Sequence, residues 1–174
     1  YKETFPDAEV HGIDVSAPSL RYAHARACSL NVDVHFHQIN AEDMPFDDQS
    51  FDLIVSRILL HETSSKALPK IVRECFRLLK PGGVMLHCDA PQFETLTPYQ
   101  ASLRDWDVTC NNEPFMFTVY DMSLEDLYVQ SGFDRNLTFM HLVPGRYIQE
   151  HQIDANATPG FSQSYFITGA SKLV

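Results

Sequence analysis

The sequence has little positive charge and no long apolar run. Its 174 residues include 13 Lys and Arg against 23 Asp and Glu, which gives a formal charge of −10. This acidic balance argues against a surface built to neutralise nucleic-acid phosphates, so we expect no nucleic-acid partner. No apolar stretch approaches the roughly 20 residues needed to cross a bilayer, so we expect no membrane-spanning segment.

The cysteine patterns of disulfide-rich and zinc-binding proteins are also missing. The four cysteines form no C-x-x-C pair and show no zinc-like spacing with the eight histidines. This pattern predicts a reduced intracellular protein, which we assign to the cytoplasm. It gives no reason to expect a metal site.

The chain nevertheless has enough apolar residues for a sizeable core. Hydrophobic residues make up 44% of the 174, so we expect a single domain over residues 1–174. The sequence starts without Met, and "YKETFPDAEVHGIDVS" reaches a predicted strand within nine residues. We therefore expect the beginning of this domain to precede Tyr1.

Strand and helix patterns alternate along the first half of the chain. The continuous apolar run in "FDLIVSR" is typical of a strand covered on both faces, and residues 32–40 alternate apolar and polar side chains. The alternation predicts crossover units, a parallel sheet and therefore an α/β fold. The predicted strands are 9–15, 32–40, 51–57 and 84–90, and the predicted helices are 17–30 and a second one from Ser64 or Ser65 to Lys80.

The pattern changes between residues 91 and 122, an irregular stretch rich in aromatic side chains. Such a segment forms either a side core or a lid over a ligand, and the sequence leaves both open. A helix capped by Ser123 and stopped at Gly132 follows. Residues 137–143 and 163–169 are the last two predicted strands, which could pair antiparallel.

Ligands of open α/β sheets bind at the carboxyl ends of the strands. An acid at such an end can accept hydrogen bonds from both hydroxyls of a ribose, although it can equally cap the next helix. The strand ends of this chain offer Asp14, then Asn40 to Asp43, then Ser56 and Arg57 with His61 and Glu62 close behind, and finally Asp89.

Several segments, in their order along the chain, resemble the class I S-adenosylmethionine-dependent methyltransferases of the small-molecule type. "GIDVS" is similar to the segment that carries the family's ribose-binding acid, and "NAEDMPFDDQSFDLIVS" resembles its "DAxxLPFxDxSFDxVxS" segment. "RLLKPGG", "SLEDLYVQSGF" and "YFITGASK" follow at the family's usual distances. The resemblance covers nearly the whole chain. It implies a Rossmann-like, mostly parallel sheet with helices on both faces and an antiparallel final strand.

The resemblance also implies a cofactor, S-adenosyl-L-methionine, and a small-molecule methyl acceptor. Asp14 would bind the ribose, and Val15 would lie against the adenine. Asn40 stands where the family often has Asp, and as a neutral amide it would accept more weakly from the adenine amino group. Alternatively, Asn40 is a turn residue whose side chain forms a hydrogen bond with a nearby backbone group instead of with the cofactor. The cofactor-binding residues implied are Asp14, Val15, Asn40, Ala41, Glu42 and Ser56.

Methyl transfer needs an aligned acceptor and, for a hydroxyl, an amine or an acidic carbon, a general base. His61 is the candidate base by position, although a structural histidine at a helix start fits the same place. For substrate contacts we consider Trp106 in the aromatic segment 91–122, and Arg146 and Tyr147 in the terminal region that often faces substrate in this family.

One element of the family pattern is absent: the first strand and its G-x-G-x-G turn. The resemblance places that strand between the strands that end at Asp14 and Ser56, and its turn against the methionine part of the cofactor. Its absence keeps a non-catalytic methyltransferase-like scaffold open as a second function. A nucleic-acid methyltransferase is disfavoured by the charge of −10, and a dehydrogenase by the antiparallel final strands.

Overall fold

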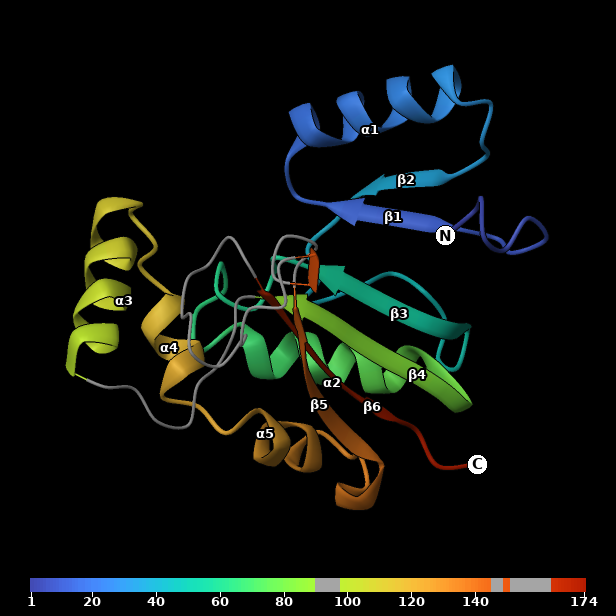
Figure 1. Cartoon of the computed structure of the whole chain (residues 1–174). Coiled ribbons are helices and arrows are strands. Elements are labelled where there is room, and N and C mark those ends of the chain that lie inside the picture. Colours follow the sequence, from blue (N-terminus) through green and yellow to red (C-terminus); the bar gives the residue numbers. More distant parts are fainter. Residues whose placement is uncertain (90–97, 145–148, 151–163) are drawn as a thin grey trace. The chain divides into compact units, whose positions relative to one another are not determined.

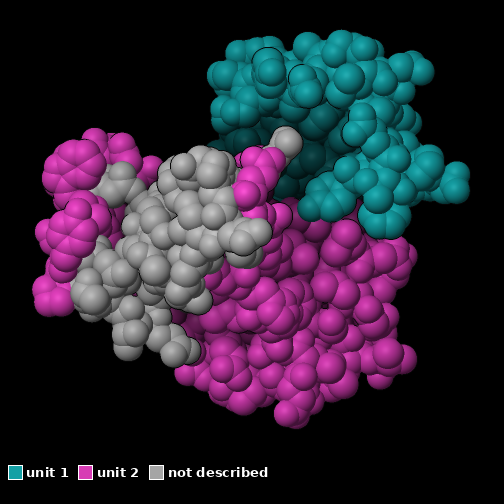
Figure 2. Space-filling view, in the orientation of Figure 1, with its two compact units in different colours: residues 1–45 teal, residues 46–174 magenta. Residues whose placement is uncertain are grey.

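The structure is a computed structural model that describes residues 1–89, 98–144, 149–150 and 164–174. The chain divides into two compact units, Tyr1–Pro45 and Phe46–Val174, which Figure 2 shows in two colours. Each unit is built from its own sheet and helices (Figure 1). Within the described part of the chain, no helix combines the length and apolarity needed to span a membrane.

The first unit is a two-stranded parallel sheet with one crossover helix. Strand β1 (His11–Asp14) pairs with β2 (His35–Gln38), so that Asp14 lies opposite Gln38 at the carboxyl end. Helix α1 (Ala17–Ser29) connects the two strands. It starts as the sequence predicts, because the Ser16 side chain accepts a hydrogen bond from the backbone N–H of Ser19 and a proline occupies the first turn.

The second unit holds a four-stranded sheet in the order β3-β4-β6-β5. Strand β3 (Phe51–Arg57) runs parallel to β4 (Leu79–Asp89). Strand β6 (Ser164–Ser171) lies antiparallel to both β4 and β5 (Thr138–Pro144). The predicted α/β class and antiparallel final strand are thus confirmed. In the described residues β1 and β3 are both edge strands.

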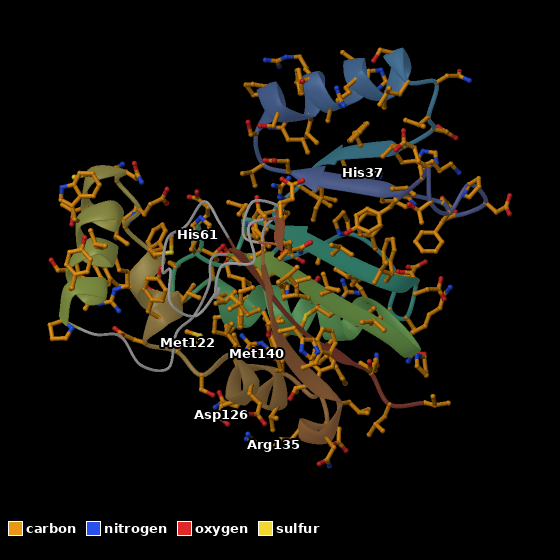
Figure 3. The ribbon with its side chains drawn as sticks, viewed as in Figure 1. His37, His61, Met122, Asp126, Arg135 and Met140 are labelled. Carbon is orange, nitrogen blue, oxygen red and sulfur yellow. The ribbon has the colours of Figure 1, made fainter. Side chains whose placement is uncertain are left out.

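Helices α2 (Leu68–Leu78) and α5 (Leu124–Gln130) contact each other and pack against this sheet (Figure 1). The apolar stripe predicted for α2 is buried, and Ser123 caps α5 as predicted, accepting from the N–H of Asp126 at 3.2 Å. Asp126, in the first turn of α5, also pairs with Arg135 of the short 3-10 turn η1 (Arg135–Leu137) (Figure 3). The core between helices and sheet includes Leu68, Val72, Leu78, Met85, Leu124, Tyr128 and Thr168.

Three expectations about local structure are wrong. The described part of the segment 91–122 is not irregular, because it forms helices α3 (Pro98–Cys110) and α4 (Met116–Tyr120). Strand β4 begins at Leu79 rather than at residue 84, with a register irregularity where the "PGG" turn passes β3. Strand β3 is not covered on both faces, since Leu53 is 43% exposed at the sheet edge.

Candidate active site

The carboxyl ends of β3 and β4 lie side by side, and the residues that follow them make the best-defined polar site. The parallel register places Ser56 beside His87 and Arg57 beside Cys88. The chain then turns at Ile58, whose N–H donates to the carbonyl oxygen of Cys88 at 2.9 Å. This turn directs the loop after β3 across the end of β4, where Asp89 is the last residue of the strand.

Asp89 organises this loop. Its side chain is 1% exposed, and its Oδ2 accepts hydrogen bonds from the backbone N–H groups of Leu59 at 3.0 Å and Leu60 at 2.8 Å. Its Oδ1 is hydrogen-bonded to Nδ1 of His61. A buried carboxylate is tolerated when donors surround it, as they do here. The loop conformation and the orientation of the His61 ring therefore depend on one side chain.

His61 is the sequence-predicted base, and its ring is 5% exposed. Burial alone lowers the pKa of an imidazole, because it penalises the charged form. The hydrogen bond and negative charge of Asp89 outweigh that effect, with further support from Glu62 and Glu113, and the pKa of His61 is raised above its usual value. Asp89 occupies Nδ1, so the ring presents Nε2 to its surroundings.

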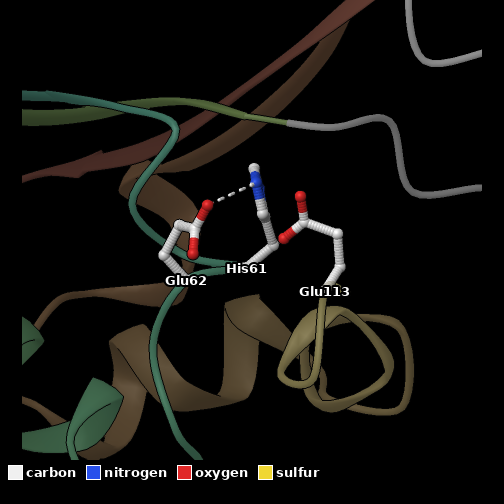
Figure 4. Close-up of side chains that lie close together, drawn as sticks. All are labelled: His61, Glu62 and Glu113. Carbon is white, nitrogen blue, oxygen red and sulfur yellow. Dashed lines mark ion pairs between the residues drawn. The ribbon is translucent and has the colours of Figure 1, made fainter. Parts of the chain in front are cut away.

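Two more carboxylates lie near Nε2 (Figure 4). An oxygen of Glu62 is 3.7 Å from it, which is an ion-pair distance but too long for a hydrogen bond. Glu113 reaches the same place from the turn between α3 and α4. One nitrogen and two carboxylate oxygens thus converge on a small volume, where a proton or another positive group is favoured.

Ser56, predicted to bind the cofactor, is engaged within the fold. Its Oγ is 2.6 Å from Nδ1 of His87, a ring that is 1% exposed and stacks on Tyr128. Burial lowers the pKa of His87 to about 4, only partly offset by the charge of Asp89. Its Nε2 has no hydrogen-bond partner among the described residues. His87 is therefore a neutral core histidine.

The other predicted cofactor residues lie together at the carboxyl end of β1 and β2. Asp14 Oδ1 accepts from the N–H of Ser16 at 2.7 Å, and Val15 is 65% exposed. Asn40 Oδ1 accepts from the N–H of Glu42 at 3.0 Å, across Ala41. Asn40 therefore closes a local turn, as its alternative interpretation expected. Asp14 also closes a local turn, but the cap of α1 is Ser16 and not Asp14. The roles of both residues toward a cofactor stay predictions.

Of the three predicted substrate residues, Trp106 is the one that lies in the described part of the chain. Trp106 projects from α3 with 65% of its surface exposed, and Arg146 and Tyr147 lie outside the described residues. Within the segment 98–122, Val108 and Met116 are buried and Tyr120 packs against them. Part of this segment is thus a small side core, and its role as a lid stays a prediction.

Sequence reasoning named Asp89 as a strand-end residue but gave it no role, and it missed Glu113. The signal for Asp89 was available: an acid that ends one parallel strand lies next to the loop that follows its neighbour. No pattern in the sequence connects Glu113 to His61, because α2, β4 and α3 separate them along the chain and only the fold brings them together.

Replacing Asp89 by Asn should lower the pKa of His61, because it removes the negative charge and the charge-assisted hydrogen bond that raise it. The measurement is an NMR titration of the His61 ring protons. Asp47→Asn, which removes an exposed acid from the loop before β3, is the matched control and should leave the value unchanged. An unchanged pKa in Asp89→Asn would contradict the assignment of Asp89 as its main cause.

His87 should make the protein less stable in mild acid. Its pKa is lowered to about 4 in the folded state, while the unfolded chain protonates near 6.5, so stability is present above pH 6.5 and falls toward pH 4. Between pH 7 and pH 5 the expected loss is about 2 kcal/mol. Urea unfolding of the wild type and of His87→Leu at both pH values measures it. The variant should lose less stability than the wild type, and equal losses would refute the prediction.

Comparisons with known proteins agree with this fold. Residues 1–83 match the sequence model of a family described as "Methyltransferase domain". The ubiquinone/menaquinone biosynthesis C-methyltransferase UbiE of Pasteurella multocida is 36% identical over 83 residues, which are 47% of this chain and 30% of that protein. Phosphoethanolamine N-methyltransferase 1 of Arabidopsis thaliana is 35% identical over 89 residues, 49% of this chain and 18% of that protein.

The same fold is seen in solved structures. The crystal structure of an S-adenosylmethionine-dependent methyltransferase from Methanosarcina mazei superposes with a TM-score of 0.66 at 22% identity, covering 95% of this chain and 82% of that one. The chain spans only about a third, or less, of the length of the curated relatives that it matches. The sequence match over residues 1–83 and the shared fold thus both relate this chain to methyltransferases.

Proposed function

We propose that the full protein transfers the methyl group of S-adenosyl-L-methionine to a small-molecule acceptor by direct in-line displacement. The observation that carries this proposal is the match of residues 1–83 to the methyltransferase-domain family, joined to a buried, oriented histidine at the strand ends where such folds bind ligands. The formal net charge of −10 supports a small molecule over a nucleic acid as acceptor.

The residues of the first unit fit the ribose and adenine parts of the cofactor. Only Oδ1 of Asp14 carries a hydrogen bond within the described residues, which leaves Oδ2 to accept from a ribose hydroxyl. Exposed Val15 offers an apolar surface to the adenine ring, and Asn40 Oδ1 retains a second lone pair for its amino group. Ala41 and Glu42 complete the cofactor residues that we propose in this unit, and Ser56, at the carboxyl end of β3, stays the predicted cofactor residue of the second unit. The methionine part needs further contacts, of the kind that a glycine-rich turn supplies.

His61 has the arrangement of a general base. The cofactor's sulfonium supplies the methyl group and the leaving group. As the acceptor atom bonds to the methyl carbon, it loses a proton, and Nε2 of His61 takes it up. Asp89, hydrogen-bonded to Nδ1, holds the ring in the tautomer that leaves Nε2 as an acceptor and stabilises the charged ring that forms. Glu62 and Glu113 stabilise the same positive charge.

The names of the relatives do not agree on which kind of atom accepts the methyl group. One carries the name of a C-methyltransferase and another that of an N-methyltransferase. A base of the His61 type serves an acidic carbon, a protonated amine or a hydroxyl equally well. Trp106, Arg146 and Tyr147 stay the proposed substrate contacts, and we propose a cytoplasmic protein.

Cofactor binding tests the proposal. The full-length protein should bind S-adenosyl-L-methionine in a calorimetric titration, and Asp14→Ala should weaken binding by at least about tenfold, because the ribose loses a charged acceptor. Asp33→Ala, which removes an exposed acid before β2, is the matched control and should bind as the wild type does. No binding at millimolar cofactor would refute methyl transfer and favour a non-catalytic scaffold.

A further inference from the structure

Three side chains of the second unit direct electron-rich atoms at one point (Figure 4). They are Nε2 of His61, a carboxylate oxygen of Glu62 and a carboxylate oxygen of Glu113, and these atoms all lie within 4.8 Å of one another. His61 is buried, Glu113 is half-buried and Glu62 is exposed.

The convergence is unfavourable without a positive group among these atoms. Asp89 is bonded to Nδ1, so in the neutral ring the lone pair is on Nε2 and faces the two carboxylates. Nε2 makes no hydrogen bond within the described residues, and its shortest approach to Glu62 is 3.7 Å. A proton on Nε2 relieves part of the repulsion. A divalent cation would be ligated by all three groups at once.

We propose that His61, Glu62 and Glu113 bind a divalent transition-metal ion. Imidazole nitrogen favours Zn²⁺ and its neighbours over Mg²⁺ and Ca²⁺, which take oxygen ligands, and the two carboxylates also suit Mn²⁺. A metal-binding histidine often donates its other ring N–H to a carboxylate, which orients the ring. Buried Asp89 is already hydrogen-bonded to Nδ1 of His61 in this way. The sequence indicates no metal site, because Glu113 lies far along the chain from His61 and Glu62 and the three form no short ligand spacing.

The geometry requires only a small adjustment. Metal–ligand bonds of roughly 2.0–2.2 Å place neighbouring ligand atoms roughly 3–3.6 Å apart. In the structure the ligand atoms of the three side chains lie within 4.8 Å of one another, so they must move closer together. The exposed Glu62 side chain can move inward by that amount without disturbing the core. His61 is fixed by Asp89, so it supplies the rigid ligand and the glutamates close on the ion.

This inference is independent of methyl transfer, because it needs neither cofactor nor acceptor. The two roles of His61 use the same lone pair, so an ion bound at Nε2 would prevent that nitrogen from accepting a proton. Binding of the ion alone is therefore the quantity to measure.

The test is a titration of the full-length protein with MnCl₂ in the absence of S-adenosyl-L-methionine, followed by electron paramagnetic resonance of free Mn²⁺ and by calorimetry. We expect saturable binding of one ion at this site. Glu62→Gln and Glu113→Gln should each weaken it at least about tenfold, and Asp89→Asn by about 10- to 100-fold, as for other supporting carboxylates. Asp47→Asn, the matched loss of one acidic charge, should bind as the wild type does.

Two results would overturn the proposal. One is the absence of saturable binding with MnCl₂ and also with ZnCl₂ up to millimolar concentration. The other is an affinity that is unchanged in both glutamate variants, which would mean that the ion binds elsewhere. Neither glutamate is buried, so these variants should fold even if Asp89→Asn does not, and circular dichroism checks this.

Discussion

The carboxylate of Asp89 accepts hydrogen bonds from three consecutive residues of the loop after β3, and the candidate site depends on it. Two of these bonds fix the backbone at Leu59 and Leu60, and the third fixes the ring of His61. A carboxylate this deeply buried is stable only while its hydrogen-bond donors stay in place. The charge of Asp89 therefore depends on the loop after β3, and the conformation of that loop depends on Asp89. Parallel pairing of β3 and β4 is what brings the two together, because it ends both strands at the same edge.

Two histidines of this unit show how neighbouring groups set ionisation in opposite directions. His87 is surrounded by the core, stacks on Tyr128 and bonds to neutral Ser56, so burial dominates and its pKa falls. His61 is also buried, but Asp89, Glu62 and Glu113 surround it with negative charge and its pKa rises. Burial therefore does not decide the state of a histidine by itself; the charge next to it does. Of these two histidines, His61 is the one whose second ring nitrogen is directed at other polar groups, and this makes it the functional candidate.

Much of the framework could be predicted from the sequence. The helix expected at 17–30 is Ala17–Ser29, because Ser16, Pro18 and an apolar period define it locally, and the Ser123 cap of α5 has the same origin. Helices α3 and α4 were not expected, since the aromatic residues and scattered polar positions of 98–122 give no clear helical period. The site itself was predicted in part. His61 follows from its position after a strand, but its partners Asp89 and Glu113 come from other elements, and spacing along the chain carries no information about such contacts.

The central claim is that His61, oriented by its hydrogen bond to Asp89, takes the proton that a small-molecule acceptor loses during methyl transfer. Its most direct test is the transfer of labelled methyl from S-adenosyl-L-methionine to a small-molecule extract by the full-length protein and by His61→Gln, with His24→Gln, an exposed histidine of α1, as control. The account predicts that His61→Gln binds the cofactor normally but transfers methyl about 100-fold more slowly, while His24→Gln is unaffected. Equal rates in His61→Gln and the wild type would contradict it.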